Sequence, residues 1–276
     1  MIKQAELFLI EFYKSIRSLL IVIVFSKKHK ITRCKKKKAI VLMNGPSLLG
    51  DIEEDNLSGD IYVSNDFASS KEFFILKPNN YVIVDPFFFQ ENERSVNIKK
   101  ILSDAKWEIN LYIPVKFQDS FFINIENKLV TIHFFNHYEI SGYSSLVRKI
   151  FDQQYGMPKC QNVLIAILMI CIWKDHKSIN LFGTDHNWLH YLSLNSENVL
   201  CLSNHRFYDS EEKIIIKPWL DQNGDSYRMD EILIKLSIMF KGYWQVLEYS
   251  KIKNIKIINN TQNSLIDAFQ KNIKFK

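Results

Sequence analysis

The stretch Lys38-Ala-Ile-Val-Leu-Met-Asn44-Gly45-Pro46-Ser47-Leu48-Leu49 decides the fold of this chain. Its apolar residues 39–42 predict a short buried strand, and Asn-Gly-Pro-Ser then turns the chain toward a helix. In an α/β protein, such a turn lies at the carboxyl end of a parallel strand, where loop amides and a helix N-terminus bind anions. Gly45 lets a ligand approach the backbone, and Asn44 can donate and accept hydrogen bonds. The same residues also suit an ordinary strand-ending turn, so the rest of the chain must decide between the two.

Two later segments repeat this pattern of a short apolar strand with a polar end. Residues 60–66 (DIYVSND) end in Asn65 and Asp66, and residues 81–86 (YVIVDP) end in Asp85 and a proline. Residues 107–115 predict a further strand. Because parallel strands end at the same edge of a sheet, these polar side chains are expected to gather there.

The second half of the chain predicts a helix–strand crossover followed by a lid. Residues 162–173 (NVLIAILMICIW) are apolar all round, as in a buried helix, and residues 178–185 form a strand that ends in Gly-Thr-Asp. From 186 to about 228 the pattern is irregular, polar and aromatic, which is typical of a functional lid.

The remaining segments complete the expected order of elements. They are a loop or edge strand over 131–145, a helix over 229–249, a last strand over 255–260, and a terminal helix over 264–269 capped by Asn263 or Ser264. The fold class expected is α/β: a Rossmann-like, mostly parallel sheet flanked by helices, with a partly irregular lid insertion. The expected domains are an N-terminal segment, 1–37, and a Rossmann-like domain, 38–276.

Charge and cysteine content narrow the class of protein. The 276-residue chain has a net charge of +6, but residues 27–38 hold eight basic side chains and the chain beyond them is net acidic. A nucleic-acid-binding protein spreads basic residues over its folded surface, so nucleic acid is excluded as the main partner. Cys34, Cys160, Cys171 and Cys201 show no CxxC pair and no metal-ligand spacing, which predicts a reducing cytoplasm and no metal site.

Residues 5–25 are strongly apolar yet contain Glu6, Glu11, Lys14 and Arg17, whereas a clean transmembrane helix needs about 20 apolar residues. No cleavage site of a signal peptide follows. An apolar helix joined to the basic run predicts that residues 5–38 lie on an anionic inner leaflet. The alternatives are an ordinary packing helix with a solvated basic linker and, as a minority case, a true membrane span.

Five motifs in order resemble the bacterial sialyltransferases of glycosyltransferase family 42. They are Val41-Leu-Met-Asn-Gly-Pro-Ser47-Leu, Val63-Ser-Asn65-Asp-Phe, Val84-Asp85-Pro86, Leu181-Phe-Gly183-Thr-Asp185 after the buried helix, and Ile255 to Phe269. The resemblance covers roughly residues 38–270. The related motility-accessory and hydroxymethylpterin pyrophosphokinase-like proteins share much of the pattern.

The resemblance implies a single GT-A-type, Rossmann-like domain and a CMP-activated sugar as donor, with no separate cofactor. The donor-binding residues that it implies are Asn44, Gly45, Pro46, Ser47, Asn65, Asp85, Gln161, Asn162, Asp185, Asn263 and Ser264. This chain departs from the family at Asp85, where the family has asparagine, and at Gln161-Asn162, where it has Ser-Gly.

Catalysis in the family is inverting and metal-independent, with a lid histidine as general base. His205 is best placed for that role, His186 is the rival and His190 is third. Tyr191, Tyr208 and Trp188 are candidates to stabilise the leaving phosphate. His133, His137 and His176 are interpreted as loop or surface residues.

The function expected is transfer of a sialic-acid-like sugar from a CMP donor to a cell-surface glycan such as lipopolysaccharide, O-antigen or capsule. The enzyme would be cytoplasmic, peripheral on the inner face of a bacterial inner membrane, and a possible homo-oligomer. The alternatives are a pterin-type pyrophosphokinase that uses ATP and Mg²⁺, and a non-catalytic scaffold in glycan assembly.

Overall fold

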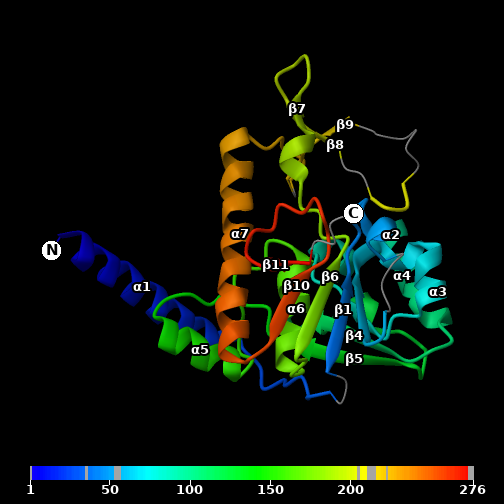
Figure 1. Ribbon diagram of the computed structural model, residues 1–276, viewed down its shortest axis with the longest axis horizontal. Helices are drawn as coiled ribbons and strands as arrows, with labels where there is room; N and C mark the ends of the chain where they lie inside the picture. Colours follow the sequence, from blue (N-terminus) through cyan, green and yellow to red (C-terminus); the bar gives the residue numbers. More distant parts are fainter. Residues whose placement is uncertain are drawn as a thin grey trace.

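A computed structural model describes residues 2–34, 37–52, 57–203, 206–209, 216–221 and 223–272. Within them, the central element is an eight-stranded sheet in the order β11-β10-β6-β1-β2-β3-β4-β5 (Figure 1). Its strands are β1 (Lys38–Leu42), β2 (Asp60–Ser64), β3 (Asn80–Val82), β4 (Ile109–Pro114), β5 (Val130–Phe135), β6 (Ser178–Phe182), β10 (Lys256–Asn259) and β11 (Gln270–Lys271). All the pairings between these neighbours are parallel, which confirms the α/β prediction.

Helices cover both faces of the sheet (Figure 1). Successive side chains of β1 point to opposite faces and are apolar on both, so both faces must be covered. Ala39 and Val41 enter one apolar core, while Ile40 and Leu42 enter the other. The first core is closed by α5 (Ser144–Asp152), α6 (Val163–Trp173) and α7 (Met229–Ile252), and the second by α2 (Leu48–Ile52), α3 (Lys71–Leu76) and α4 (Glu93–Asp104). From β1 the strands β2 to β5 follow one another to one side of the sheet, whereas β6, β10 and β11 lie on the other side. The topological switch point is therefore between β1 and β6.

Helix α6 is the buried helix that the sequence predicts. All of its residues, 163–173, are buried, and the Asn162 side chain caps its first turn by accepting a hydrogen bond from the Leu164 amide. An element that is apolar on every side can be stable only where protein surrounds it, and α6 lies between the sheet and α7.

The insertion at 186–228 contains more regular structure than its sequence indicates. The short turn η5 (Trp188–Tyr191) leads into an antiparallel sheet of β7 (Leu192–Leu194), β8 (Leu200–Ser203) and β9 (Ile216–Pro218). This small sheet lies at the top of Figure 1, beyond the carboxyl ends of the parallel strands. It is therefore placed as a lid over that edge.

The terminal helix predicted over 264–269 is wrong. The Ser264 hydroxyl donates to the Thr184 carbonyl at 2.6 Å, and the Leu265 amide donates to the Asp185 carbonyl at 3.0 Å. These bonds hold the segment extended against the loop after β6, and it continues into β11. Tertiary hydrogen bonds thus replace the helical ones that local propensity favours.

Helix α1 (Ile2–Phe25) packs on the protein through Ser15, Ser18, Ile21 and Val22 and leaves most of its large apolar side chains outward. Ser15 and Ser18 are buried, and the Ser18 hydroxyl donates to the Ser141 carbonyl at 2.6 Å. In contrast, twelve large hydrophobic side chains are exposed; they are Leu7, Phe8, Leu9, Ile10, Phe12, Tyr13, Ile16, Leu19, Leu20, Ile23, Val24 and Phe25. The helix extends from the body beside α5 (Figure 1). Among the described residues, no helix is long and apolar enough to cross a membrane.

The basic segment after α1 is docked on the body and is not a solvated linker. The Asn136 side chain bonds both backbone groups of Lys27, the Gln154 side chain bonds both of Ile31, and the Cys34 amide donates to the Lys174 carbonyl at 3.0 Å. Residues 27–34 are thereby held at the amino ends of the strands. The domain boundary at residue 37 stays a prediction.

Candidate active site

A cavity of about 710 Å³ opens at the carboxyl ends of the parallel strands and extends under the lid. Eleven of the residues proposed from sequence line it: Asn44, Gly45, Pro46, Asn65, Asp85, Gln161, Asn162, Asp185, His186, Trp188 and Tyr191. Such cavities at the switch point of a parallel sheet are the usual ligand sites of α/β proteins. The strand-end reading of the sequence therefore locates the site.

Gly45 is required by the close approach of two strand-end loops. Its amide donates to the Gly183 carbonyl at 3.0 Å. A Cβ atom at this position would lie 1.8 Å from an Asp185 carboxylate oxygen and 2.5 Å from the Gly183 carbonyl. No other residue fits without moving the loop after β6, which carries Asp185 and His186 into the cavity.

Behind the cavity, Ser47 joins two carboxylates. Its hydroxyl lies 2.9 Å from Oδ2 of Asp51 and 2.9 Å from Oδ2 of Asp185. Asp51 Oδ2 also accepts the Gly183 amide and the Thr261 hydroxyl. Burial, with the nearby Asp51 charge, raises the pKa of Asp185. A hydroxyl has one proton, so Ser47 can satisfy both carboxylates as donor and acceptor only if one of them is protonated. Ser47 therefore positions the loops and does not itself line the cavity.

Three buried polar atoms of cavity-lining residues have no hydrogen-bond partner within the described part of the chain. They are Oδ1 of Asn44, Oδ1 of Asn65 and Nε2 of His137. Asn65 also adopts a left-handed backbone conformation, with φ of 53°. An unpaired buried polar group costs roughly 1–3 kcal/mol, so three of them around one cavity indicate that a polar ligand completes the bonding. His137 lies in the loop after β5, as predicted from sequence, and its side chain is partly buried; desolvation lowers the pKa of His137 to about 4.

The cavity also contains cationic groups that sequence reasoning did not find. Asp66 is buried and is held by the guanidinium groups of Arg94 from α4 and Arg206 from the lid. Lys116, in the turn after β4, is a further cation on the cavity wall. Two arginines share one carboxylate, so this group keeps a net positive charge suited to an anion. No motif spacing links residues 66, 94 and 206; only the fold brings them together.

A chain of hydrogen bonds fixes how His186 faces the cavity. Oδ1 of Asn162 accepts the Leu164 amide at 3.0 Å, which leaves Nδ2 to donate to the Tyr243 hydroxyl at 2.5 Å. The Tyr243 hydroxyl lies 2.8 Å from Nδ1 of His186. If Tyr243 donates its proton to Nδ1, every member is satisfied and the imidazole carries its proton on Nε2.

With the proton on Nε2, His186 is a neutral hydrogen-bond donor. Desolvation lowers the pKa of His186 to about 3, and its ring stacks on Trp188 and Tyr243 with centroid separations of 4.7 and 5.5 Å. A histidine of this tautomer donates through Nε2–H and does not act as a base there. Tyr243, deep in α7, was not expected from sequence because nothing in a helical pattern marks a buried tyrosine as a relay.

The other proposed residues have different positions. The Tyr208 hydroxyl accepts from Arg206 at 2.9 Å, beside the cavity, and His190 is exposed at its entrance. Asn263 is exposed and Ser264 is bound behind the loop after β6, so neither lines the cavity. His205, the first choice for the base, lies outside the described residues. The lid adds Asn187, Trp219 and Tyr227 to the cavity wall.

Comparisons with known proteins give three solved structures from Campylobacter jejuni. The sialyltransferase CstII in complex with cytidine-5'-monophosphate has 17% identity and a TM-score of 0.43, over 85% of this chain and 84% of that one. An α-2,3-sialyltransferase in apo form has 15% identity and a TM-score of 0.45, over 91% and 87%. CstII with CMP-3FNeuAc has 16% identity and a TM-score of 0.43, over 87% and 89%.

No protein-family profile matches the chain, and no curated protein sequence matches it. At identities of 15–17% and TM-scores below 0.5, the likeness decides neither the activity nor the ligand of this chain. Both must be inferred from its own residues.

Proposed function

We propose that this chain is a glycosyltransferase that moves a sialic-acid-like sugar from a CMP donor to a cell-surface glycan. The observation that carries the proposal is the meeting of Asn44 and Asn65, the donor-binding asparagines of the motif resemblance, in one cavity with their amide oxygens unsatisfied. These oxygens can accept hydrogen bonds from a nucleotide's amino or hydroxyl groups. The cationic group of Arg94, Arg206 and Lys116 suits the phosphate and carboxylate of such a donor.

The chemistry required is a displacement at the anomeric carbon. The acceptor hydroxyl loses its proton to a base as its oxygen bonds that carbon, and the bond to the phosphate oxygen breaks with release of CMP. A single in-line displacement inverts the carbon. His186 Nε2–H is placed to donate to the leaving phosphate, and no step in this scheme needs a metal. If His186 donates through Nε2–H, the general base must be another residue, and we propose His205 of the lid for that role.

The carboxylates of the cavity favour this function over a pyrophosphokinase. ATP-dependent transfer uses Mg²⁺ held by ionised carboxylates. Asp66 is already committed to two arginines, and Asp185 has a raised pKa and accepts the Ser47 hydroxyl. Asp85 is exposed, but its Oδ1 already accepts a hydrogen bond from the Phe87 amide in the turn that follows. A catalytically silent scaffold has no need of unsatisfied amides in a cavity.

Calorimetry on the full chain tests the donor class. CMP, UDP, GDP and ATP would each be titrated with and without Mg²⁺. Selective, Mg²⁺-independent binding of CMP is expected, weakened about tenfold or more by Asn44→Ala or Asn65→Ala, since each removes a hydrogen bond to the ligand. Asn97→Ala, an exposed asparagine on α4, is the matched control. Mg²⁺-dependent ATP binding would instead assign the kinase, and no binding would favour the scaffold.

The same proposal places the enzyme on an anionic membrane surface through residues 5–38. Its support is the outward apolar side of α1 next to the basic run, a combination that suits a helix lying in the interface. Here, on the inner face of a bacterial inner membrane, lipid-linked glycan acceptors would be within reach.

Flotation with phosphatidylglycerol vesicles, against phosphatidylcholine vesicles, tests the attachment. Ile23→Glu should release the protein, because Ile23 is 76% exposed on α1. Ile75→Glu, at an equally exposed isoleucine on α3 (69%), should leave attachment unchanged. If wild type does not bind vesicles but is a dimer that Ile23→Glu converts to a monomer and Ile75→Glu leaves intact, α1 instead pairs copies of the chain.

A further inference from the structure

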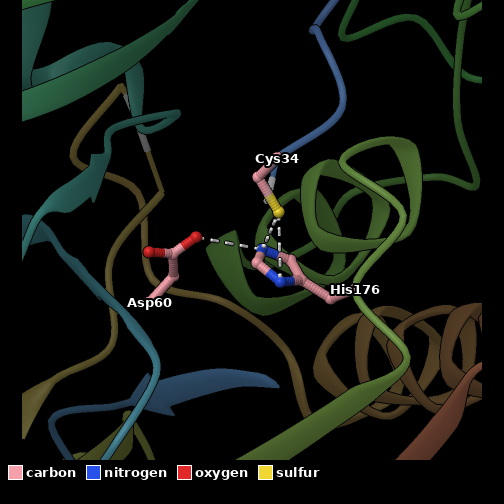
Figure 2. Close-up of side chains that lie close together, drawn as sticks. All are labelled: Cys34, Asp60 and His176. Atoms are coloured by element: carbon pink, nitrogen blue, oxygen red, sulfur yellow. Dashed lines mark hydrogen bonds and ion pairs between the residues drawn. The ribbon is translucent and has the colours of Figure 1, made fainter. Parts of the chain in front are cut away.

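A cysteine, a histidine and an aspartate meet at the amino ends of the strands, on the opposite edge of the sheet from the cavity. Cys34 belongs to the segment before β1, Asp60 begins β2, and His176 lies in the turn between α6 and β6. Figure 2 shows the three side chains converging. His176 lies in a loop, as predicted from sequence, but its side chain is fully buried.

The distances within this Cys34–Asp60–His176 cluster are those of groups that share one ion. The Cys34 Sγ lies 3.4 Å from Nδ1 and 3.6 Å from Nε2 of His176, and Nε2 lies 3.7 Å from Asp60 Oδ2. One ligand atom from each residue lies within 4.8 Å of the other two. Zinc bonds of about 2.0–2.3 Å in a tetrahedron separate neighbouring ligand atoms by about 3.4–3.6 Å. The Sγ–Nε2 and Nε2–Oδ2 separations are close to that geometry, and Sγ lies within 4.8 Å of the Asp60 carboxylate.

Neighbouring groups hold these side chains as outer-shell partners hold metal ligands. The other oxygen of Asp60 accepts from Asn79 Nδ2 at 2.8 Å, which fixes the carboxylate with Oδ2 toward the imidazole. The Tyr62 hydroxyl lies 2.7 Å from His176 Nε2, the ring nitrogen that faces Asp60, and holds the ring in place in the absence of an ion. Lys174 contributes its carbonyl 3.4 Å from the thiol. Such support is the feature that separates a metal site from a chance cluster.

We propose that Cys34, Asp60 and His176 bind a structural zinc ion that clasps the segment before β1 to the body of the enzyme. Binding replaces the Cys34 thiol proton, which is released to solvent, and the bond between Tyr62 and Nε2 gives way to the ion. Thiolate, imidazole and carboxylate together favour zinc over calcium or magnesium. Because Cys34 is separated from His176 by 142 positions, the ion would close a long loop.

A zinc ion at this site would hold the segment between α1 and β1 against the body of the protein. Residues 27–34 follow α1, and they are also attached to the body by hydrogen bonds to Asn136, Gln154 and Lys174 and by the buried side chain of Ile31. An ion at Cys34 anchors the end of that connection to β2 and to the turn before β6. The apolar helix then stays fixed relative to the sheet. This inference is independent of which sugar or nucleotide the cavity binds.

The test is a titration of the full-length, metal-stripped protein with Co²⁺ alone and then Zn²⁺ alone. One equivalent of Co²⁺ should give the thiolate-to-cobalt absorption band, and Zn²⁺ should abolish it. At a hundredfold excess over Kd, Zn²⁺ should raise the Tm by about 5 °C, and the chelator EDTA should reverse the rise. Cleavage by trypsin within the lysine-rich residues 27–38 should slow on addition of zinc.

Two variants and one control keep the outcome decisive. Cys34→Ser removes a half-buried thiol and Asp60→Asn preserves shape, so both should fold, lose the Co²⁺ band and lose the Zn²⁺-dependent Tm rise. Cys201→Ser, a buried cysteine in the lid, should keep both responses. Circular dichroism before metal addition verifies folding. A wild-type protein that shows no thiolate band and no Tm shift, or a Cys34→Ser variant that keeps them, overturns the proposal and leaves a hydrogen-bonded cluster without an ion.

Discussion

The two ends of the parallel sheet differ in that some buried polar atoms at the carboxyl end lack partners among the described residues. At the carboxyl end, Asn44, Asn65 and His137 leave polar atoms without partners around a cavity. At the amino end, the equally buried Lys174 donates to Tyr112 at 2.9 Å and to Asn80 at 3.3 Å, and Tyr112 donates to Asn80 at 3.2 Å. Polar groups that hydrogen-bond to one another stabilise the fold, whereas buried polar atoms without a protein partner can bind a ligand.

The difference predicts that substitutions at the carboxyl end change binding and turnover, while those at the amino end change stability. Gly45→Ala should have the largest effect, because its added Cβ overlaps Asp185 and Gly183 and displaces both strand-end loops. We expect loss of measurable CMP binding by calorimetry. Gly50→Ala on α2 is the control, since its Cβ meets no neighbouring atom. Normal CMP binding by Gly45→Ala would contradict the assignment of the site.

His186→Phe tests the donor at the leaving group. The ring's volume and stacking are kept while Nε2–H is lost, so turnover should fall about 100-fold with the Kd for CMP changed little. Tyr243→Phe should reduce turnover less, because it removes the hydrogen bond that fixes the tautomer of His186 but leaves the imidazole in place. ¹⁵N NMR of the wild-type ring should show the proton on Nε2. A proton on Nδ1 would return His186 to the role of general base.

Acid should destabilise the protein through the histidines at the carboxyl end. Burial lowers the pKa of His186 to about 3 and of His137 to about 4, below the ordinary value of about 6.5 in the unfolded chain. The unfolded chain therefore binds more protons between these values, so stability is full above pH 6.5 and falls as the pH decreases. Each histidine contributes a slope of up to about 1.4 kcal/mol per pH unit.

Urea unfolding at pH 7 and pH 5 measures this slope. The loss of stability from pH 7 to pH 5 should be smaller in His186→Phe than in wild type, and smaller again when His137→Gln is added. His190→Gln, at the exposed lid histidine, should leave the wild-type slope unchanged. Equal slopes in wild type and His186→Phe would show that the imidazole is not buried neutral.

Tyr112→Phe should have the smallest effect and should act on stability alone. It removes one hydrogen bond from the buried Lys174 ammonium and one from Asn80, at a cost of about 1 kcal/mol in the free energy of unfolding. CMP affinity should match wild type, because Tyr112 is at the other end of the sheet. A change in affinity larger than the change in stability would break the division between the two ends.

The positions of several strands along the chain could be predicted from sequence, because each of these strands has a short apolar run and a polar end. Asn44, Asn65, Asp85 and Asp185 were found this way and do line one cavity. Arg94 and Lys116 were not found, since a cation on a helix or turn has the same local pattern whether it faces solvent or a site. The lid sheet was missed for a related reason: its strands are only three or four residues long.

Local sequence by itself determined the α/β fold, the buried helix α6 and the edge of the sheet at which the cavity lies, because apolar periodicity and strand-end residues are properties of neighbours in the chain. Only the tertiary structure decided that α1 turns its apolar side outward, that residues 264–269 stay extended, and that Asn162, Tyr243 and His186 form one relay. It alone joins Cys34 to His176 across 142 positions. These features depend on which distant groups compete for each hydrogen bond, and that competition exists only after the chain has folded.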